Sequence, residues 1–267
     1  MWWLAVAAGL FFFKDKIAQR LAPMLPVMTP QKSTFYGHVM TLFTGLLYLL
    51  PVELVGLGVV KRLAYLACLW STIMTCGLTI KANYGMPPMP QAMSIAAIKQ
   101  LMATTLQPWL AKAVHSVDFN FLFFALIFVT AYPSILALAI LGRRSLWSVC
   151  THCAKNEADG GRLWVLFKPQ WEKLSAKNAE VIHYSSMAEI MLGFWLTASL
   201  FLPTRQILTC FLYWNYLRTR FQGERSGKQH LQAWMQIGKQ VEPLLKVAPF
   251  LQKPIDMAKG WFQPPRG

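Results

Sequence analysis

The sequence predicts an all-α, polytopic membrane protein with three to four membrane helices or helical hairpins and amphipathic surface helices. Of its 267 residues, 55% are hydrophobic and only 14% are charged, whereas soluble domains have about 25% charged residues. Long apolar stretches recur along the chain, and basic residues flank almost all of them. The mean hydropathy of +0.37 is too high for one soluble core of this length. Intrinsic disorder is excluded because disordered chains are poor in apolar residues.

The first segment, residues 1–35, is predicted to be an apolar and basic interfacial segment. Its apolar run, residues 1–13, is shorter than the roughly 20 residues that cross a bilayer. Positive charge follows this run instead of preceding it, and no small-residue cleavage site is present, so a signal peptide is not indicated. We expect an interfacial or half-inserted helix here, with an uncleaved anchor as the alternative.

Residues 36–217 form the predicted membrane domain. The first two apolar stretches are separated only by Lys61-Arg62, which predicts a tight helical hairpin. The third has 23 residues without a charge, and the fourth consists of two half-length segments that suit a re-entrant wedge as well as a crossing. Proline lacks an amide hydrogen, so we expect Pro51, Pro133 and Pro203 to break these helices. The predicted spans are about 39–60, 63–80, 119–141 and 187–217.

Two polar, basic segments, residues 81–117 and 142–182, connect the predicted spans as amphipathic loops. Lys and Arg flanks normally mark the cytosolic side of a membrane protein. Here nearly every flank is basic, so strictly alternating crossings would put some basic segments on the wrong side. Hairpins that return to the side they entered remove this conflict and predict a wedge that favours curved membrane.

The last segment, residues 218–267, is predicted to be a basic, amphipathic tail. It has nine Lys and Arg residues against three acids, which suits an anionic membrane surface. We expect its helix to dock on lipid or on a partner; the alternative is packing against the chain's own loop 142–182. The candidate contact residues are four that share one helical face, Leu231, Trp234, Val241 and Leu245, and the basic residues Lys228, Lys239 and Lys246.

Two acids within the apolar stretches, Glu53 and Glu189, are candidates for function because intramembrane carboxylates are costly. They favour, as an alternative, a channel or transporter subunit. The simpler interpretation is an acid at the headgroup level or one paired with Lys or Arg. The net charge of +15 suits anionic lipid, and the hydropathy argues against direct nucleic-acid binding.

Catalytic and metal-binding motifs are absent from the sequence. Neither a nucleophile elbow, nor a phosphate-binding loop, nor a helical His pair occurs. Cys150 and Cys153 form a lone C-x-x-C without a second pair of ligands. We therefore predict no catalytic residue, no metal site and no cofactor, so the chain is not expected to be an enzyme. A lipid-modifying membrane enzyme is the least favoured alternative, and the oligomeric state is not predicted.

Four segments together resemble the transmembrane protein 33 family, of the yeast pore-membrane protein 33 and Krüppel-homologue-2 type. They are LFTGLLYLLP (42–51), FALIFVTAYP (124–133), WEKLSAKNAEVIHYSSMAEI (171–190) and YWNYLRTRF (213–221), within a likeness that covers about residues 36–250.

The resemblance implies a non-enzymatic, multi-pass protein of the endoplasmic reticulum membrane and nuclear envelope. Such a protein would shape or organise tubular membrane and serve as an adaptor for reticulon-type proteins and nuclear pore components. The family's C-terminal amphipathic helix is linked to membrane and importin binding, which would carry over to Leu231, Trp234, Val241, Lys239 and Lys246. Two features depart from the family: the apolar residues 1–22, and the prolines Pro243 and Pro249 in the tail.

Overall fold

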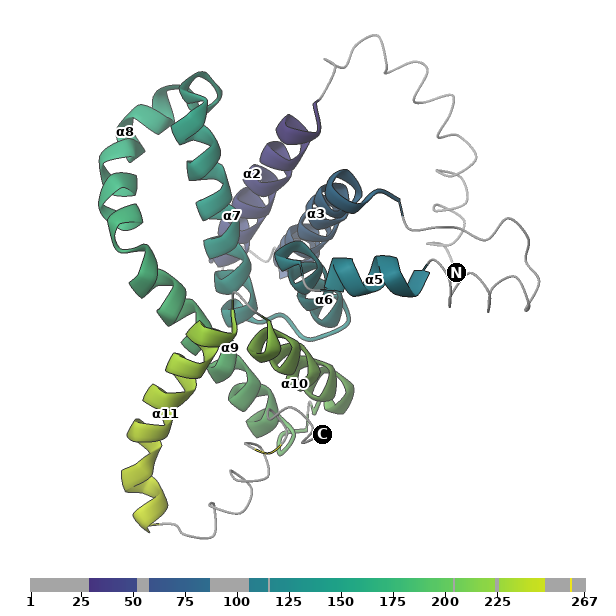
Figure 1. Ribbon diagram of the computed structural model, residues 1–267, viewed down its shortest axis with the longest axis vertical. Helices are drawn as coiled ribbons and strands as arrows, with labels where there is room; N and C mark the ends of the chain where they lie inside the picture. Colours follow the sequence, from purple (N-terminus) through teal and green to yellow (C-terminus); the bar gives the residue numbers. More distant parts are fainter. Residues whose placement is uncertain are drawn as a thin grey trace, which may run out of the picture.

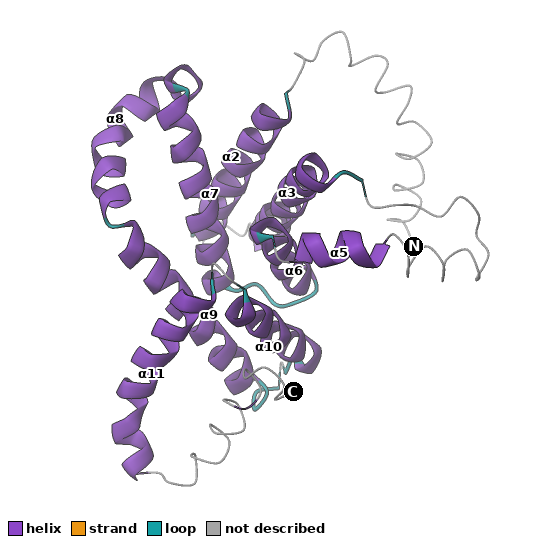
Figure 2. Ribbon diagram, in the orientation of Figure 1, coloured by secondary structure: helices purple, strands orange, loops and turns teal. Residues whose placement is uncertain are grey.

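The computed structural model describes residues 29–51, 58–86, 106–114, 116–203, 205–223, 226–247 and 260, and the regular elements in these ranges are α-helices without strands (Figure 1, Figure 2). The predicted all-α class is therefore confirmed. The predicted interfacial helix of residues 1–13 and most of the tail beyond residue 247 lie outside the described residues. The helices are α2 (Pro30–Leu49), α3 (Gly58–Tyr84), α5 (Gln107–Val114), α6 (Val117–Val129), α7 (Ile135–Lys155), α8 (Glu157–Ala176), α9 (Asn178–Ser199), α10 (Ile207–Gln222) and α11 (Gly227–Val247).

The first two helices, α2 and α3, pack as an antiparallel pair. The Tyr48 and Tyr65 rings lie 5.6 Å apart near the turn, and the Ser71 hydroxyl donates to the Gly37 carbonyl at 2.8 Å further along. At Gly37 the helices approach so closely that a Cβ would collide with the Thr75 hydroxyl. The helix predicted over 39–60 ends at Leu49 instead, because the residue before Pro51 is extended.

The apolar stretch 119–141 is not one continuous helix. It divides into α6 and α7 at a turn over residues 130–134, which contains Pro133. Ser134 begins α7 by accepting a hydrogen bond from the Ala137 amide. The helix then continues past residue 141, where the predicted span ends, to Lys155, and Arg144 forms an ion pair with Asp118 of α6.

The segment predicted as an amphipathic loop, residues 142–182, is largely helical. α7 extends to Lys155, and α8 returns along it and arcs along the left edge of the molecule (Figure 1). Gly161 kinks α8 with φ of 54° and ψ of −152°. Trp164 and Trp171 thereby both reach α7, where they pack with Phe35, Cys150 and Cys153 in a small second core.

Helices α9 and α10 pack on each other and are joined by a turn over residues 200–206 that contains Pro203. The Tyr213 hydroxyl donates to the Glu189 carbonyl at 2.8 Å, and the Trp214 indole donates to the Thr197 hydroxyl at 2.9 Å. The main core extends from α3 and α7 through α6 to this pair, and the Phe124 and Phe128 rings contact Tyr213 edge-on.

Among the described residues, only α3 is by itself long and apolar enough to cross a membrane. α5 and α6 pass the same test together, but they are bent by 91° with respect to each other. The three to four predicted membrane helices are therefore not confirmed as full crossings. The reason is that turns at Pro51, Pro133 and Pro203 divide the apolar stretches into shorter helices.

Candidate functional site

A buried ionic cluster joins the last three helices, and its centre is Glu189. This residue lies in the middle of α9 and is fully buried. Arg220 of α10 donates to both of its carboxylate oxygens, from Nε and from a terminal nitrogen, each at 3.1 Å. The Tyr216 hydroxyl adds a longer hydrogen bond of 3.4 Å. Such a bidentate ion pair has a defined geometry and therefore fixes the register of α9 against α10.

His230 connects α11 to the same carboxylate. Its Nε2 lies 3.1 Å from Glu189 Oε2, while its Nδ1 is buried and has no hydrogen-bond partner within the described part of the chain. The Ser226 hydroxyl, just before α11, donates to the Arg220 carbonyl at 2.5 Å. The contacts of Ser226 and His230 thus hold the start of α11 against Arg220 and Glu189.

The charges within the cluster stabilise each other's ionised forms. Burial alone lowers the pKa of Arg220, but the adjacent Glu189 carboxylate more than offsets this effect and the pKa is raised. The sequence indicates that a Lys or Arg could pair with Glu189, but not which one. Arg220 and His230 are 31 and 41 residues away in the chain, a separation at which helical periodicity carries no information.

The inner side of α11 packs on α9 and α10. Ala233 and Ile237 are buried against Ile190 of α9, and Val241 packs beside them. The Trp234 ring is stacked on Trp214 of α10, with centroids 6.4 Å apart. Of the predicted contact residues, Trp234 and Val241 therefore lie half-buried inside the protein, and the Leu245 side chain lies outside the described residues.

The outer side of α11 carries an exposed stripe that follows the helical repeat. Leu231 is 43% exposed and Met235 is 57% exposed. Three lysines and one acid complete this outer stripe, which we define as Lys228, Leu231, Met235, Lys239, Glu242 and Lys246. Lys246 pairs with Glu242 one turn earlier at 3.5 Å. The predicted basic residues thus share one surface with Leu231, and Met235 is a member that the sequence analysis missed.

The other predicted site residues lie apart from this cluster. Pro51, Pro133 and Pro203 are exposed in the three turns, and Glu53 lies outside the described residues. Two surface cavities lie elsewhere: one is near Arg62 and Gln206, and the other is near Arg144 and Lys155. Glu189 lines neither of them. The channel interpretation, which needs Glu189 in a hydrated cavity, therefore gains no support from this residue.

The C-x-x-C residues, Cys150 and Cys153, are free thiols buried on one side of α7. Burial raises the pKa of the Cys150 thiol to about 11, so the thiolate that metals and electrophiles require is scarce at neutral pH. Within the described ranges no three His, Cys, Asp or Glu residues are placed to hold a metal ion.

The comparisons with known proteins gave one match. The family model described as Transmembrane protein 33/Nucleoporin POM33 matches residues 18–241. Neither the curated proteins nor the solved structures include a match.

Proposed function

Because the chain belongs to the Transmembrane protein 33/Nucleoporin POM33 family, and so is a membrane protein, we propose that it shapes or organises tubular membrane of the endoplasmic reticulum and nuclear envelope. In this proposal it catalyses no reaction. It acts as an adaptor for other proteins of those membranes, with reticulon-type proteins, nucleoporins and importins as the partner classes that the family resemblance suggests.

One observation carries the proposal: the α6–α7 turn, the α9–α10 turn and the start of α3 gather at one end of the bundle. The Tyr132 amide in the α6–α7 turn donates to the Gln206 side chain in the α9–α10 turn at 3.3 Å. Residues near the start of α3 (Arg62, Tyr65 and Leu66) line one cavity together with residues of the α6–α7 turn and of the α9–α10 turn. This arrangement suits three helix–turn–helix segments, α2–α3, α6–α7 and α9–α10, that enter a bilayer from one side and turn back within it.

The short apolar length of these helices supports a wedge. Residues 119–129 and 207–217 contain no charge and flank two of the turns, with 11 residues each. At 1.5 Å per residue each stretch is ~16 Å long, about half of the roughly 30 Å hydrocarbon core. Helices of this length occupy mainly one leaflet or thin the bilayer locally, and either outcome favours curvature.

Charged side chains bound this apolar layer at the end opposite the turns. Arg144 pairs with Asp118, and Glu189 pairs with Arg220. Each charge is neutralised by a partner on another helix, which reduces the cost of holding it close to hydrocarbon.

Reconstitution of the full chain into liposomes tests the shaping function. We expect that raising the protein-to-lipid ratio converts large vesicles into tubules or small vesicles in electron micrographs. Protein-free vesicles taken through the same detergent removal are the control. Vesicles that keep their size and shape at every ratio would contradict the proposal.

The outer stripe of α11 is the surface that we propose for contact with anionic lipid. Leu231 and Met235 supply apolar area, and Lys228 and Lys239 supply positive charge beside them. The inner side is held by the protein itself, so the stripe can meet a surface without unfolding the helix from α9.

An environment-sensitive dye on Met235→Cys tests this contact in nanodiscs, since the five native cysteines are buried. We expect a blue shift of dye emission in discs containing phosphatidylserine and little shift in purely zwitterionic discs. Gln240→Cys, roughly 140° around the helix and also exposed, is the matched control. Equal shifts at both positions, or no dependence on lipid charge, would exclude the stripe as the lipid-binding surface.

A further inference from the structure

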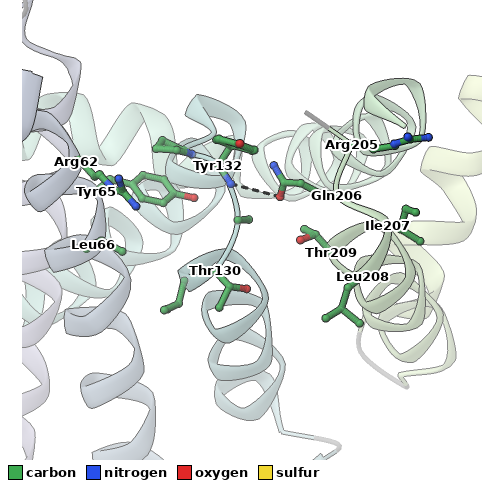
Figure 3. A pocket seen from close by; sticks show the side chains of 13 residues that line it. Arg62, Tyr65, Leu66, Thr130, Tyr132, Arg205, Gln206, Ile207, Leu208 and Thr209 are labelled. Carbon is green, nitrogen blue, oxygen red and sulfur yellow. Dashed lines mark hydrogen bonds between the residues drawn. The ribbon is translucent and has the colours of Figure 1, made fainter. Parts of the chain in front are cut away.

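A cavity of about 860 Å³ lies where the start of α3, the α6–α7 turn and the start of α10 meet (Figure 3). Arg62, Tyr65 and Leu66 of α3 form one side, and residues 205–209 form the opposite side. The α6–α7 turn lies between them. The ionic cluster of Glu189 does not contribute to this cavity, so its chemistry is separate from the features described above.

The Tyr65 hydroxyl is a buried polar group whose hydrogen-bonding capacity is unused. Tyr65 is only 1% exposed, and among the described residues its hydroxyl has no hydrogen-bond partner of good geometry, although the backbone of Ser134 is close. Figure 3 shows its ring directed from α3 toward the turn that carries Tyr132. A buried hydroxyl without a partner is costly, which indicates that a ligand completes its hydrogen bonding.

The lining of the cavity is cationic and offers donors. Arg62 and Arg205 are exposed, form no ion pair with the described residues, and are not balanced by any carboxylate in the lining. The start of α10 has no side-chain cap, because the Gln206 side chain accepts from the Tyr132 amide instead. The first amide groups of α10 therefore present the positive end of a 16-residue helix to the cavity.

The position of the cavity points to the source of an anionic ligand. Arg62 lies in the second turn of α3, the helix that is long and apolar enough to cross a membrane. Ile207 and Leu208 line the same cavity and are strongly exposed, so they supply apolar area next to the charged groups. Because the charge-free stretches beside the turns are short, a locally thinned bilayer brings its headgroups to this end of the bundle. A phosphate beside apolar side chains there corresponds to a membrane phospholipid.

We propose that this cavity binds the phosphate headgroup of an anionic phospholipid. The phosphate is contacted by Arg62 and by the amides that begin α10, and the Tyr65 hydroxyl donates to the headgroup. The acyl chains lie along Ile207 and Leu208. The proposal does not depend on the contact between α11 and lipid or on membrane curvature, and it is measured on the protein in detergent.

Binding of short-chain lipids to the full chain in micelles tests the site. We expect saturable binding of dioctanoyl phosphatidylinositol and much weaker binding of dioctanoyl phosphatidylcholine. Arg62→Gln removes a charge-assisted contact and should raise the Kd about tenfold. Arg162→Gln removes the same charge from an exposed position on α8 and should leave the Kd unchanged.

Tyr65→Phe separates binding from folding. The hydroxyl has no well-aligned hydrogen-bond partner among the residues that the structure describes, so its removal should not lower the Tm, whereas it should weaken lipid binding several-fold. Glycerophosphoinositol and inorganic phosphate distinguish the sources of the phosphate: weak binding of both supports a membrane lipid, and binding as tight as that of the lipid overturns that source. Equal affinity for the two lipids, or equal effects of Arg62→Gln and Arg162→Gln, would overturn the site itself.

Discussion

Glu189 is the residue on which the packing of the last three helices depends. Its carboxylate is fully buried and receives Arg220, Tyr216 and His230 from two other helices. A buried ion pair adds little net stability over a well-packed apolar pair, but the loss of one partner leaves an uncompensated charge. The consequence is that each member of the cluster becomes indispensable once the others are present.

Replacing Glu189 with Gln should lower the free energy of unfolding by about 3 kcal/mol, because Arg220 would remain buried without a counter-charge. Equilibrium unfolding in detergent measures this change. Glu180→Gln, an exposed position on the same helix without an ion pair among the described residues, should change the value by less than about 0.5 kcal/mol. Similar losses for both variants would show that the cluster is not a buried ion pair.

Cys150 should react slowly with iodoacetamide in the folded protein at pH 7. Its thiol pKa is raised to about 11, so the reactive thiolate is rare well below that pH, and the side chain is buried. Mass spectrometry of a labelling time course checks this prediction, and the unfolded chain serves as the fully reactive control. Rapid modification of the folded protein would reopen a redox or metal role for the C-x-x-C.

At the scale of one element, α8 depends on a single glycine. Gly161 has φ of 54° and ψ of −152°, a combination that residues other than glycine rarely adopt. The resulting kink lets α8 follow α7 and place Trp171 edge-on to Trp147, with ring centroids 4.7 Å apart. The arm formed by α7 and α8 therefore depends on local backbone geometry as well as on apolar contact.

Gly161→Ala should cost roughly 1–3 kcal/mol of stability because of backbone strain. Gly142→Ala, inside α7, should instead stabilise the protein by about 0.5–1 kcal/mol through helix propensity. A Cβ at either position would meet no atom within 4 Å, so steric overlap does not distinguish the two. Thermal unfolding of both variants measures the difference, and effects of the same sign would contradict the role of the kink.

At the scale of the whole molecule, the arrangement of the turns determines how the chain can sit in a membrane. If all three helix pairs enter from one side, then α5, α8 and α11 lie on that side. The basic segments would then all lie on one side of the membrane, as the positive-inside rule expects for the cytosolic side. Independent crossings would instead place some of these segments on opposite sides.

Single cysteines at Lys112, Lys173 and Lys228 should react together with a membrane-impermeant maleimide in sealed vesicles of the native membrane. These exposed positions lie on α5, α8 and α11, and the native cysteines, all buried, provide a low background. Phe201→Cys, in the α9–α10 turn at a position 91% exposed, should stay unlabelled from that side. Labelling of Lys112→Cys and Lys173→Cys from opposite sides would rule out the hairpin arrangement.

Much of the fold could be predicted from the sequence because its determinants are local. The apolar stretches and the low charge content indicate helices in a membrane protein. Pro51, Pro133 and Pro203 indicate the turns, since proline cannot donate the helical hydrogen bond. The sequence did not reveal that α7 extends past Gly142 to Lys155, nor that Arg144 in this extension pairs with Asp118, 26 residues away.

By itself, the sequence determined the helical class, the breaks in the apolar stretches and the amphipathic character of α11. Only the tertiary structure decided that Glu189 meets Arg220 and His230, that Trp234 turns inward while Leu231 stays exposed, and that Arg62 and Arg205 lie around one cavity. The physical reason is that helical periodicity specifies which residues share a face of one helix. Which faces of distant helices meet depends on side-chain packing and charge pairing across the whole bundle.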